Sequence, residues 1–175
     1  MTDLRYPIGE FTGLSDVTTD QRRALIGEIA AAPSALRSAA AGLGNAQLDT
    51  PYRPDGWSVR QVVHHVPESH MNAYVRFKLA LTEETPTIKT YDQAAWSTLA
   101  DTARTPIEVS LTLLEALHRR WTILLESMDA ADYQKRLVHP DHGPVSLEWM
   151  LQLYAWHGRH HAAHITELRK REGWG

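Results

Sequence analysis

The sequence predicts an all-α protein, a four-helix bundle with long connecting loops. Two observations support this prediction: apolar residues recur every three or four positions along four long segments, and no segment shows the alternating pattern of a half-buried strand. The composition favours a packed core, because 43% of the 175 residues are hydrophobic and 22% are charged. A chain of this length predicts a single domain over residues 1–175.

The first predicted helix follows an N-terminal arm, residues 1–18. Thr18 or Thr19 can cap it, and the apolar positions continue to Gly42, a residue type that commonly ends helices. We expect Pro33 to bend or interrupt this helix, because proline lacks a backbone N–H and its ring clashes with the preceding turn.

The second predicted helix runs from Ser58 to about Leu81, after a loop at residues 45–56 that contains two prolines and an Asp-Gly pair. Ser58 and Gln61 have the spacing of a capping box, in which each side chain bonds to the backbone N–H of the other residue. We expect Pro67 to kink this helix.

The third predicted helix starts at Thr105, with Pro106 at its first position and Glu108 completing a capping box, and continues to about Met128. The fourth runs from Ser146 to about Gly173. Long connections precede both helices, and such connections usually carry function or cover a site. They are residues 83–105, with a short helix from Tyr91 to Leu99, and residues 129–145, rich in Asp, His, Pro and Gly.

The composition also excludes several kinds of site. Without cysteine the chain has no disulfide scaffold, no thiolate zinc site and no cysteine nucleophile. A formal net charge of -3 gives no electrostatic reason to bind nucleic acid or an anionic membrane. No apolar run reaches the ~18 residues of a membrane span, and the N-terminus lacks a secretory pattern. We therefore expect a cytoplasmic protein that binds neither nucleic acid nor membrane.

Histidine is the residue type that points to a function, since seven of the 10 histidines lie on the second and fourth predicted helices. With Leu147 as reference direction and about 100° per residue, His161 falls at about -40° and His157 at about -80°, inside or bordering the apolar face. Two imidazoles one turn apart can reach one ion at about 2.0–2.1 Å. A pair of inward histidines is also harder to satisfy by hydrogen bonds than a single one. His164 lies near the edge of this face, and His160 points outward.

In a bundle the third ligand comes from a facing helix. The second predicted helix offers His64, His65 and His70. Apolar periodicity favours His70, whereas His65 lies about 120° from the centre of the apolar face. A kink at Pro67 weakens this choice, because it rotates one half of the helix against the other. The residue after His157 is glycine, so the pattern is not that of an H-E-x-x-H protease.

Two histidine-bearing motifs and two shorter segments can be compared with known families. They are Tyr6-Pro7-Ile8-Gly9, Trp57 to Val66 followed by Glu68-Ser69-His70-Met71-Asn72, Arg76 to Glu83, and Tyr154 to Ile165. Together they resemble the DinB-like family and look closest to its YfiT branch. The likeness covers nearly the whole chain, and the two histidine motifs in this order are fairly specific.

The resemblance implies a bundle that holds one divalent metal ion through His65, His157 and His161. The family's first ligand stands eight residues after the tryptophan that opens the second helix, which favours His65 over His70. No catalytic residue is assigned, although Glu68 or a nearby histidine could act as general base. The residues expected to line the pocket or contact the ligands are His64, Glu68, His70, Tyr154 and His164, and His160 is left as a pocket or surface candidate.

Three imidazole ligands leave open positions on a zinc or nickel ion, which is typical of catalytic sites. Such an ion activates water, and this predicts a metal-dependent hydrolase. The alternative is a bacillithiol S-transferase, in which the ion binds a small-molecule thiol as its thiolate. Members of the family are described in both ways. Imidazole suits zinc and nickel alike, so both metals and both nucleophiles stay open.

A second alternative is a non-catalytic, dimeric interaction module. Trp149 and Trp156 fall opposite the histidines of the fourth predicted helix. They pack there against another helix or the N-terminal arm, or else they form a subunit interface, where tryptophan is enriched. The resemblance implies a homodimer. For an enzyme, the expected partners are a small-molecule substrate and, for the transferase, a thiol cosubstrate.

Overall fold

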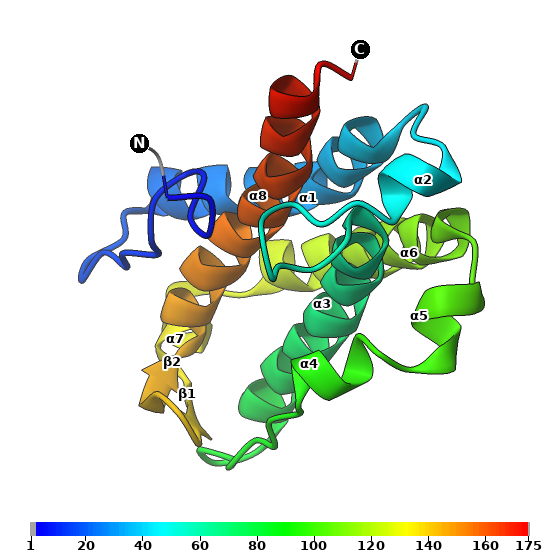
Figure 1. Ribbon diagram of the computed structural model, residues 1–175. Helices are drawn as coiled ribbons and strands as arrows, with labels where there is room; N and C mark the ends of the chain where they lie inside the picture. The colour runs from blue at the N-terminus through cyan, green and yellow to red at the C-terminus, as the bar shows by residue number, and fades with distance from the viewer. Residues whose placement is uncertain (1–2, 175) are drawn as a thin grey trace.

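Four long helices form a bundle in the structure, a computed structural model that describes residues 3–174 (Figure 1). The prediction of an all-α four-helix bundle is confirmed. Helix α1 packs against α8 and α6, and α3 packs against the same two helices, so the four form a ring in the order α1, α8, α3, α6. Their bounds are α1 (Thr19–Ala40), α3 (Val59–Thr82), α6 (Ile107–Ser127) and α8 (Leu147–Glu172).

Short helices occupy the first two connections between the long helices. Helix α2 (Asn45–Leu48) lies within the segment that the sequence predicted to be a loop. Helix α4 (Gln93–Trp96) lies within the short helix expected from Tyr91 to Leu99, whereas α5 (Ala100–Arg104) was not expected. A helix of one turn is too short to show the apolar periodicity on which those predictions depended.

The connection at residues 129–145 was predicted to be a loop, and this prediction is wrong. It contains α7 (Ala130–Gln134) and the strands β1 (Arg136–His139) and β2 (Gly143–Ser146). The strands pair antiparallel. Two strands of four residues, one of them with a proline, are too short for an alternating pattern to be visible in the sequence.

Local cap signals predicted three helix starts correctly. The hydroxyls of Thr18, Ser58 and Ser146 each accept a hydrogen bond from a backbone N–H three residues later. Thr105 does not start α6, because its backbone N–H closes the preceding helix α5. Pro106 stands before α6 without a side-chain cap, so the predicted capping box does not form.

Neither proline interrupts its helix, since α1 continues through Pro33 and α3 through Pro67. The residue four positions before a helical proline has a carbonyl that lacks its usual N–H partner. In α1 this residue is Ile29, and its carbonyl oxygen lies 2.6 Å from Nδ1 of His118 on α6. A side chain of a neighbouring helix therefore takes the place of the missing backbone donor.

The core consists of two apolar clusters, one around Phe77 and Trp121 and the other around Val63 and Leu114. Along α3, α6 and α8, histidines occur between the positions that enter one cluster and those that enter the other. This layer places imidazoles from three helices at one level of the bundle. They are His70 on α3, His118 on α6, and His157 and His161 on α8.

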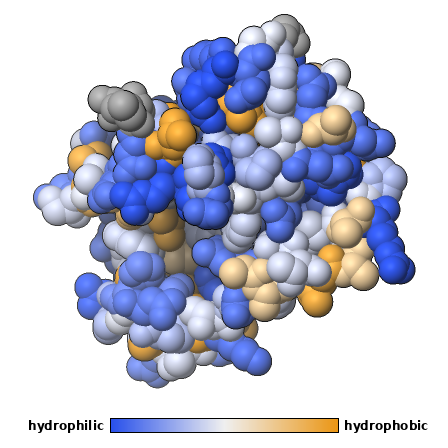
Figure 2. Space-filling view, viewed as in Figure 1, coloured by the Kyte–Doolittle hydropathy of each residue, from blue (hydrophilic) through white to orange (hydrophobic). Residues whose placement is uncertain are grey.

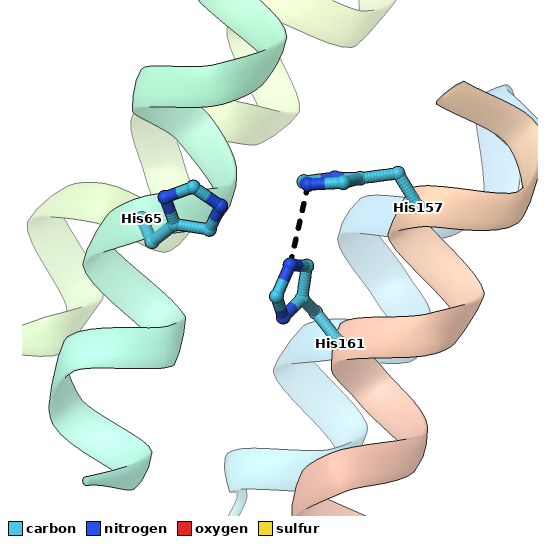
Figure 3. A group of neighbouring side chains, drawn as sticks. All are labelled: His65, His157 and His161. Carbon is cyan, nitrogen blue, oxygen red and sulfur yellow. Dashed lines mark hydrogen bonds between the residues drawn. The ribbon is translucent and has the colours of Figure 1, made fainter. Parts of the chain in front are cut away.

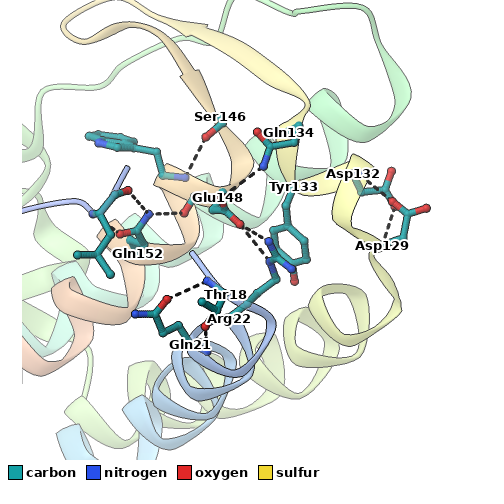
Figure 4. A network of polar contacts seen from close by, with 12 residues as sticks. Thr18, Gln21, Arg22, Asp129, Asp132, Tyr133, Gln134, Ser146, Glu148 and Gln152 are labelled. Carbon is teal, nitrogen blue, oxygen red and sulfur yellow. Dashed lines mark hydrogen bonds and ion pairs between the residues drawn. The ribbon is translucent and has the colours of Figure 1, made fainter. Parts of the chain in front are cut away.

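Polar contacts hold the start of α8 to the rest of the chain (Figure 4). The Glu148 carboxylate is buried beside Arg22 of α1, with 3.1 Å between the arginine Nε and Oε1. Gln134 of α7 donates to its other oxygen at 3.3 Å. The side-chain oxygen of Gln152 accepts a hydrogen bond from the N–H of Leu14 at 2.7 Å. This last contact fixes the N-terminal arm to α8.

The face in Figure 2 is largely hydrophilic, and its apolar side chains form small separate patches. Within residues 3–174, no helix is long and apolar enough to cross a membrane. Trp149 and Trp156 pack against the N-terminal arm, where the ring of Phe11 lies 5.5 Å and 5.9 Å from theirs. Of the two roles considered for these tryptophans, packing against the arm is the one observed.

Candidate metal centre

Three histidines face one another where α3 passes α8 (Figure 3). His65 projects from α3, and His157 and His161 project from successive turns of α8. One ring nitrogen from each can be chosen so that all three lie within 4.8 Å of one another. The trio implied by the family resemblance is therefore assembled by the fold.

The spacing of the two α8 histidines suits a single ion. Their Nε2 atoms are 3.2 Å apart. Two nitrogens bound at about 2.0–2.1 Å to one tetrahedral zinc ion would be about 3.3 Å apart. Three imidazoles are also a donor set that zinc and nickel accept. By distance and by chemistry, the residues present fit one divalent cation.

Burial keeps the three imidazoles neutral. It lowers the pKa of His65 to about 4. Burial, reinforced by the neighbouring imidazoles, holds the pKa values of His157 and His161 well below the usual range. An ion competes with protons for imidazole nitrogens, so neutral rings are ready to bind it.

The apolar periodicity of α3 predicted His70 as the third ligand, whereas the trio contains His65. Both side chains are buried, with 3% of His65 and 0% of His70 exposed. Helix α3 packs against α8, α6 and α5, so several of its faces are covered and no single stripe marks the side that meets α8. The ring of Trp57 lies 4.7 Å from that of His65 and holds it on the side of the trio.

His70 lies directly behind His157. Its Nε2 is 3.0 Å from Nδ1 of His157, and its Nδ1 is 2.8 Å from Nε2 of His118. Sequence reasoning assigned no role to His118, a single histidine on α6. Pro33 is the feature of the sequence that could have pointed to His118. A proline four residues after Ile29 leaves the Ile29 carbonyl without a helical partner, and His118 contacts this carbonyl.

His164 lies behind His161 in a similar way. Its Nδ1 is 3.4 Å from Nδ1 of His161, and its Nε2 is 3.0 Å from the backbone oxygen of Arg5. The ring of Tyr52 stacks on it, with 3.9 Å between ring centroids. His164, which the sequence placed near the edge of the apolar face, is thus enclosed by the N-terminal arm and by the loop that precedes α3.

His160 was expected to point outward, and this expectation is wrong. Only 7% of it is exposed, because the N-terminal arm covers its face of α8. Its ring stacks on Trp156 with 4.2 Å between centroids and lies 6.0 Å from the ring of Tyr6. His160, His161 and His164 form a second group whose nitrogens lie within 4.8 Å of one another. This group shares His161 with the first trio.

The remaining candidates are His64, Glu68 and Tyr154, and none of them belongs to either group of histidines. Nδ1 of His64 is 2.7 Å from the hydroxyl of Ser110, so this ring faces α6. Glu68 is half-buried, and burial raises its pKa. The buried ring of Tyr154 lies 5.6 Å from that of His157 and 5.2 Å from that of His70. Tyr154 therefore supports these two imidazoles from the side.

A cavity of about 390 Å³ gives access to the trio. A pocket of this size accommodates a small molecule. Nε of Arg53 is buried and lacks a hydrogen-bond partner among the residues that the structure describes. The walls combine the five histidines of the two groups with Tyr52, Arg53, Asp55, Gly56, Trp57, Gln93 and Trp156.

Comparisons with known proteins agree with this geometry. The sequence model of the DinB superfamily matches residues 28–165. A protein of Bacillus cereus (strain AH820), named "Putative metal-dependent hydrolase", is 54% identical over 174 residues, which are 99% of this chain and 100% of the relative. A protein of Bacillus anthracis with the same name and the same coverage is also 54% identical.

The solved structure of YfiT from Bacillus subtilis is also similar to this chain. It has a TM-score of 0.96 and 47% sequence identity, and the match covers 99% of this chain and 100% of YfiT. That protein is described as "a probable metal-dependent hydrolase with an unusual four-helix bundle topology". By its sequence and its fold, the chain belongs to the DinB superfamily and is YfiT-like.

Proposed function

We propose that this chain is a metal-dependent hydrolase in which His65, His157 and His161 hold one zinc or nickel ion. The observation that carries the proposal is the 3.2 Å distance between the two Nε2 atoms of the α8 pair, with a nitrogen of His65 in reach. The names of the relatives support the same reaction class. When bound, such an ion lowers the pKa of water to about 7 and polarises a carbonyl or phosphoryl oxygen.

Residues of the cavity bind and orient the substrate. His65, His157 and His161 would hold the ion beside the cavity, and a site with three protein ligands would keep a position for water or substrate. Trp57 and Trp156 provide apolar walls that orient a small substrate, and Arg53 suits an anionic group on it, since its Nε has no partner among the described residues. A cavity wall that combines apolar rings with the Arg53 guanidinium and the Asp55 carboxylate favours a small substrate with apolar and polar parts.

The decisive measurement is the metal content of untagged protein purified without added metal. We expect about one ion per chain in the wild type and a sharp loss in His65→Ala. His160→Ala is the matched control, because His160 belongs only to the second group of histidines. Metal retained in His65→Ala and lost in His160→Ala would place the ion in the second group and contradict the proposed site.

A panel of esters and amides then tests the reaction. We expect hydrolysis that a chelator abolishes and zinc or nickel restores. Equal hydrolysis with and without the ion would refute a metal-dependent reaction. Bound metal without turnover of any substrate, with or without an added thiol, would favour the interaction module.

A thiol S-transferase is the second candidate, because the open side of the ion could bind a thiolate instead of water. The chain has no cysteine, so the thiol would be a small molecule that enters the cavity. Turnover of an electrophile only when a low-molecular-weight thiol such as bacillithiol is present would favour the transferase over the hydrolase. Sedimentation of the same samples tests the homodimer that the family resemblance implies.

A further inference from the structure

A row of buried imidazoles connects the metal trio to the backbone of α1. It begins at Nδ1 of His157, which lies 3.0 Å from Nε2 of His70. Nδ1 of His70 lies 2.8 Å from Nε2 of His118, and Nδ1 of His118 lies 2.6 Å from the carbonyl oxygen of Ile29. Each distance is that of a hydrogen bond. The row crosses the bundle through α8, α3, α6 and α1.

The last member of the row fixes the position of every proton in it. A carbonyl oxygen can only accept, so Nδ1 of His118 carries a proton and, in a neutral ring, its Nε2 accepts. His70 must then donate from Nδ1 and accept at Nε2. For the same reason His157 donates from Nδ1, and its Nε2 keeps a free lone pair. That lone pair lies on the nitrogen which faces His161.

We propose that His118 and His70 are positioning residues that hold His157 as its Nδ1–H tautomer, with Nε2 free to bind the ion. The inference rests on the proposed metal site and adds a role for two residues outside it. An imidazole whose other nitrogen donates to a fixed acceptor is oriented and made more basic as a ligand. Here the fixed acceptor is the Ile29 carbonyl, acting through two intervening rings.

Two residues, Pro33 and Gly158, contribute to this arrangement. Pro33 removes the N–H that would otherwise bond to the Ile29 carbonyl, so this oxygen is available to His118. Gly158 lets α8 approach α1 and His70 closely. A Cβ at position 158 would lie 2.8 Å from Cβ of Ala32 and 3.7 Å from Cε1 of His70. Position 158, directly after the ligand His157, therefore requires a small residue, since α1, α3 and α8 meet there.

His161 has a similar support, which strengthens the argument. Nε2 of His164 donates to the carbonyl of Arg5, so Nδ1 of a neutral His164 accepts from Nδ1–H of His161. Nε2 of His161 then also keeps its lone pair. Two lone pairs 3.2 Å apart repel unless a cation lies between them. The hydrogen bonds of both rows thus prepare this point for a positive ion.

The tautomers can be observed directly in the chelator-treated protein. Long-range proton–nitrogen correlation spectra of 15N-labelled protein distinguish protonated from bare ring nitrogens. We expect His118, His70 and His157 all to carry their proton on Nδ1. A wild-type spectrum with the proton of His157 on Nε2 would overturn the proposal.

Variants at position 118 test the effect on ion binding. His118→Phe removes the link to the carbonyl, and His70 then loses the acceptor that fixes its proton. We expect Ni²⁺ to bind more weakly, by up to the about 10–100-fold that is usual when the direct partner of a ligand is removed. His118→Gln can still donate to Ile29 and accept from His70. It should recover most of the affinity. Leu125→Ala, a fully buried change on the same helix, is the control for a general loss of stability. Its Ni²⁺ affinity should stay within about twofold of wild type.

The outcomes separate this inference from the proposed reaction. The positioning role is supported if Ni²⁺ affinity falls in His118→Phe but stays near the wild-type value in His118→Gln and Leu125→Ala. This holds even if no ester is hydrolysed. If all three variants bind Ni²⁺ with wild-type affinity, the proposed role of His118 and His70 is wrong, and the hydrolase proposal is unaffected. If His118→Phe does not fold, His118→Gln decides: weakened binding with the proton of His157 still wholly on Nδ1, or a mixed tautomer of His157 with wild-type Ni²⁺ affinity, would overturn the proposal.

Discussion

Acid should destabilise the metal-free protein, because folding keeps buried imidazoles neutral. His118 and His65 are 2% and 3% exposed, and burial lowers the pKa of each to about 4. In the unfolded chain a histidine has a pKa of about 6.5. Between pH 6.5 and 4 the unfolded state therefore binds more protons than the folded state. Stability is lost as the pH falls through this window and stays unchanged above it.

The loss can be worked out for each residue. At pH 5 a histidine with these two pKa values lowers the free energy of unfolding by about 2 kcal/mol relative to pH 8, so His118 and His65 together remove about 4 kcal/mol. For a chain of this length about 1 kcal/mol corresponds to roughly 2–4 °C in Tm. The other buried imidazoles whose pKa is lowered, such as His160 and His70, add to this loss. We therefore expect Tm in the presence of a chelator to fall by at least roughly 8–16 °C between pH 8 and pH 5.

Thermal melts followed by circular dichroism at pH 8, 7, 6 and 5 measure this dependence. His118→Gln is the matched control, since glutamine keeps the donor and acceptor of the imidazole but does not titrate. Between pH 8 and pH 5 its Tm should fall by roughly 4–8 °C less than that of the wild type, which is the share of His118. A Tm that is equal at pH 8 and pH 5, or an identical slope in His118→Gln, would refute the claim that these imidazoles are buried in their neutral form.

Three further expectations follow from particular contacts. Gly158→Ala puts a Cβ 2.8 Å from that of Ala32, so α1 and α8 must separate, and we expect both a lower Tm and weaker Ni²⁺ binding; unchanged Ni²⁺ affinity would contradict the close packing. Arg22→Met leaves the Glu148 carboxylate buried without its cation and should lower the free energy of urea unfolding by about 3 kcal/mol, whereas adding Glu148→Gln should restore most of it. The rise in Tm caused by zinc or nickel should be larger at pH 7.5 than at pH 5.5, since protons compete for the ligands; an equal rise at both would argue against histidine ligation.

The long helices and part of the site could be predicted because their signals are local. The caps at Ser58 and Ser146 depend on residues three positions apart, and the structure has both. The direction of His157 and His161 toward the bundle follows from helical geometry alone. Both kinds of prediction need only one helix, so no knowledge of neighbouring segments is required.

The predictions about histidines that failed depend on contacts between distant segments. His160 was placed on the outer face of α8 correctly as to angle, but the N-terminal arm covers that face, and nothing in the periodicity of α8 reports this. The periodicity of α3 favoured His70 over His65 because it assumed a single apolar stripe, whereas several helices cover α3. His118 shows no pattern along α6, and its role appears only when the carbonyl exposed by Pro33 is considered.

The histidine layer is difficult to explain by stability alone. A buried polar group is tolerated when it is hydrogen-bonded, and an apolar side chain of similar size would fill the same space without that requirement. The layer meets the requirement through two rows that end on backbone carbonyls, those of Ile29 and Arg5. Both rows run toward the same point, and their proton positions leave the two α8 nitrogens there, 3.2 Å apart, without protons. An arrangement selected only for packing would have no reason to bring two lone pairs together in this way, whereas a site that binds a cation requires it.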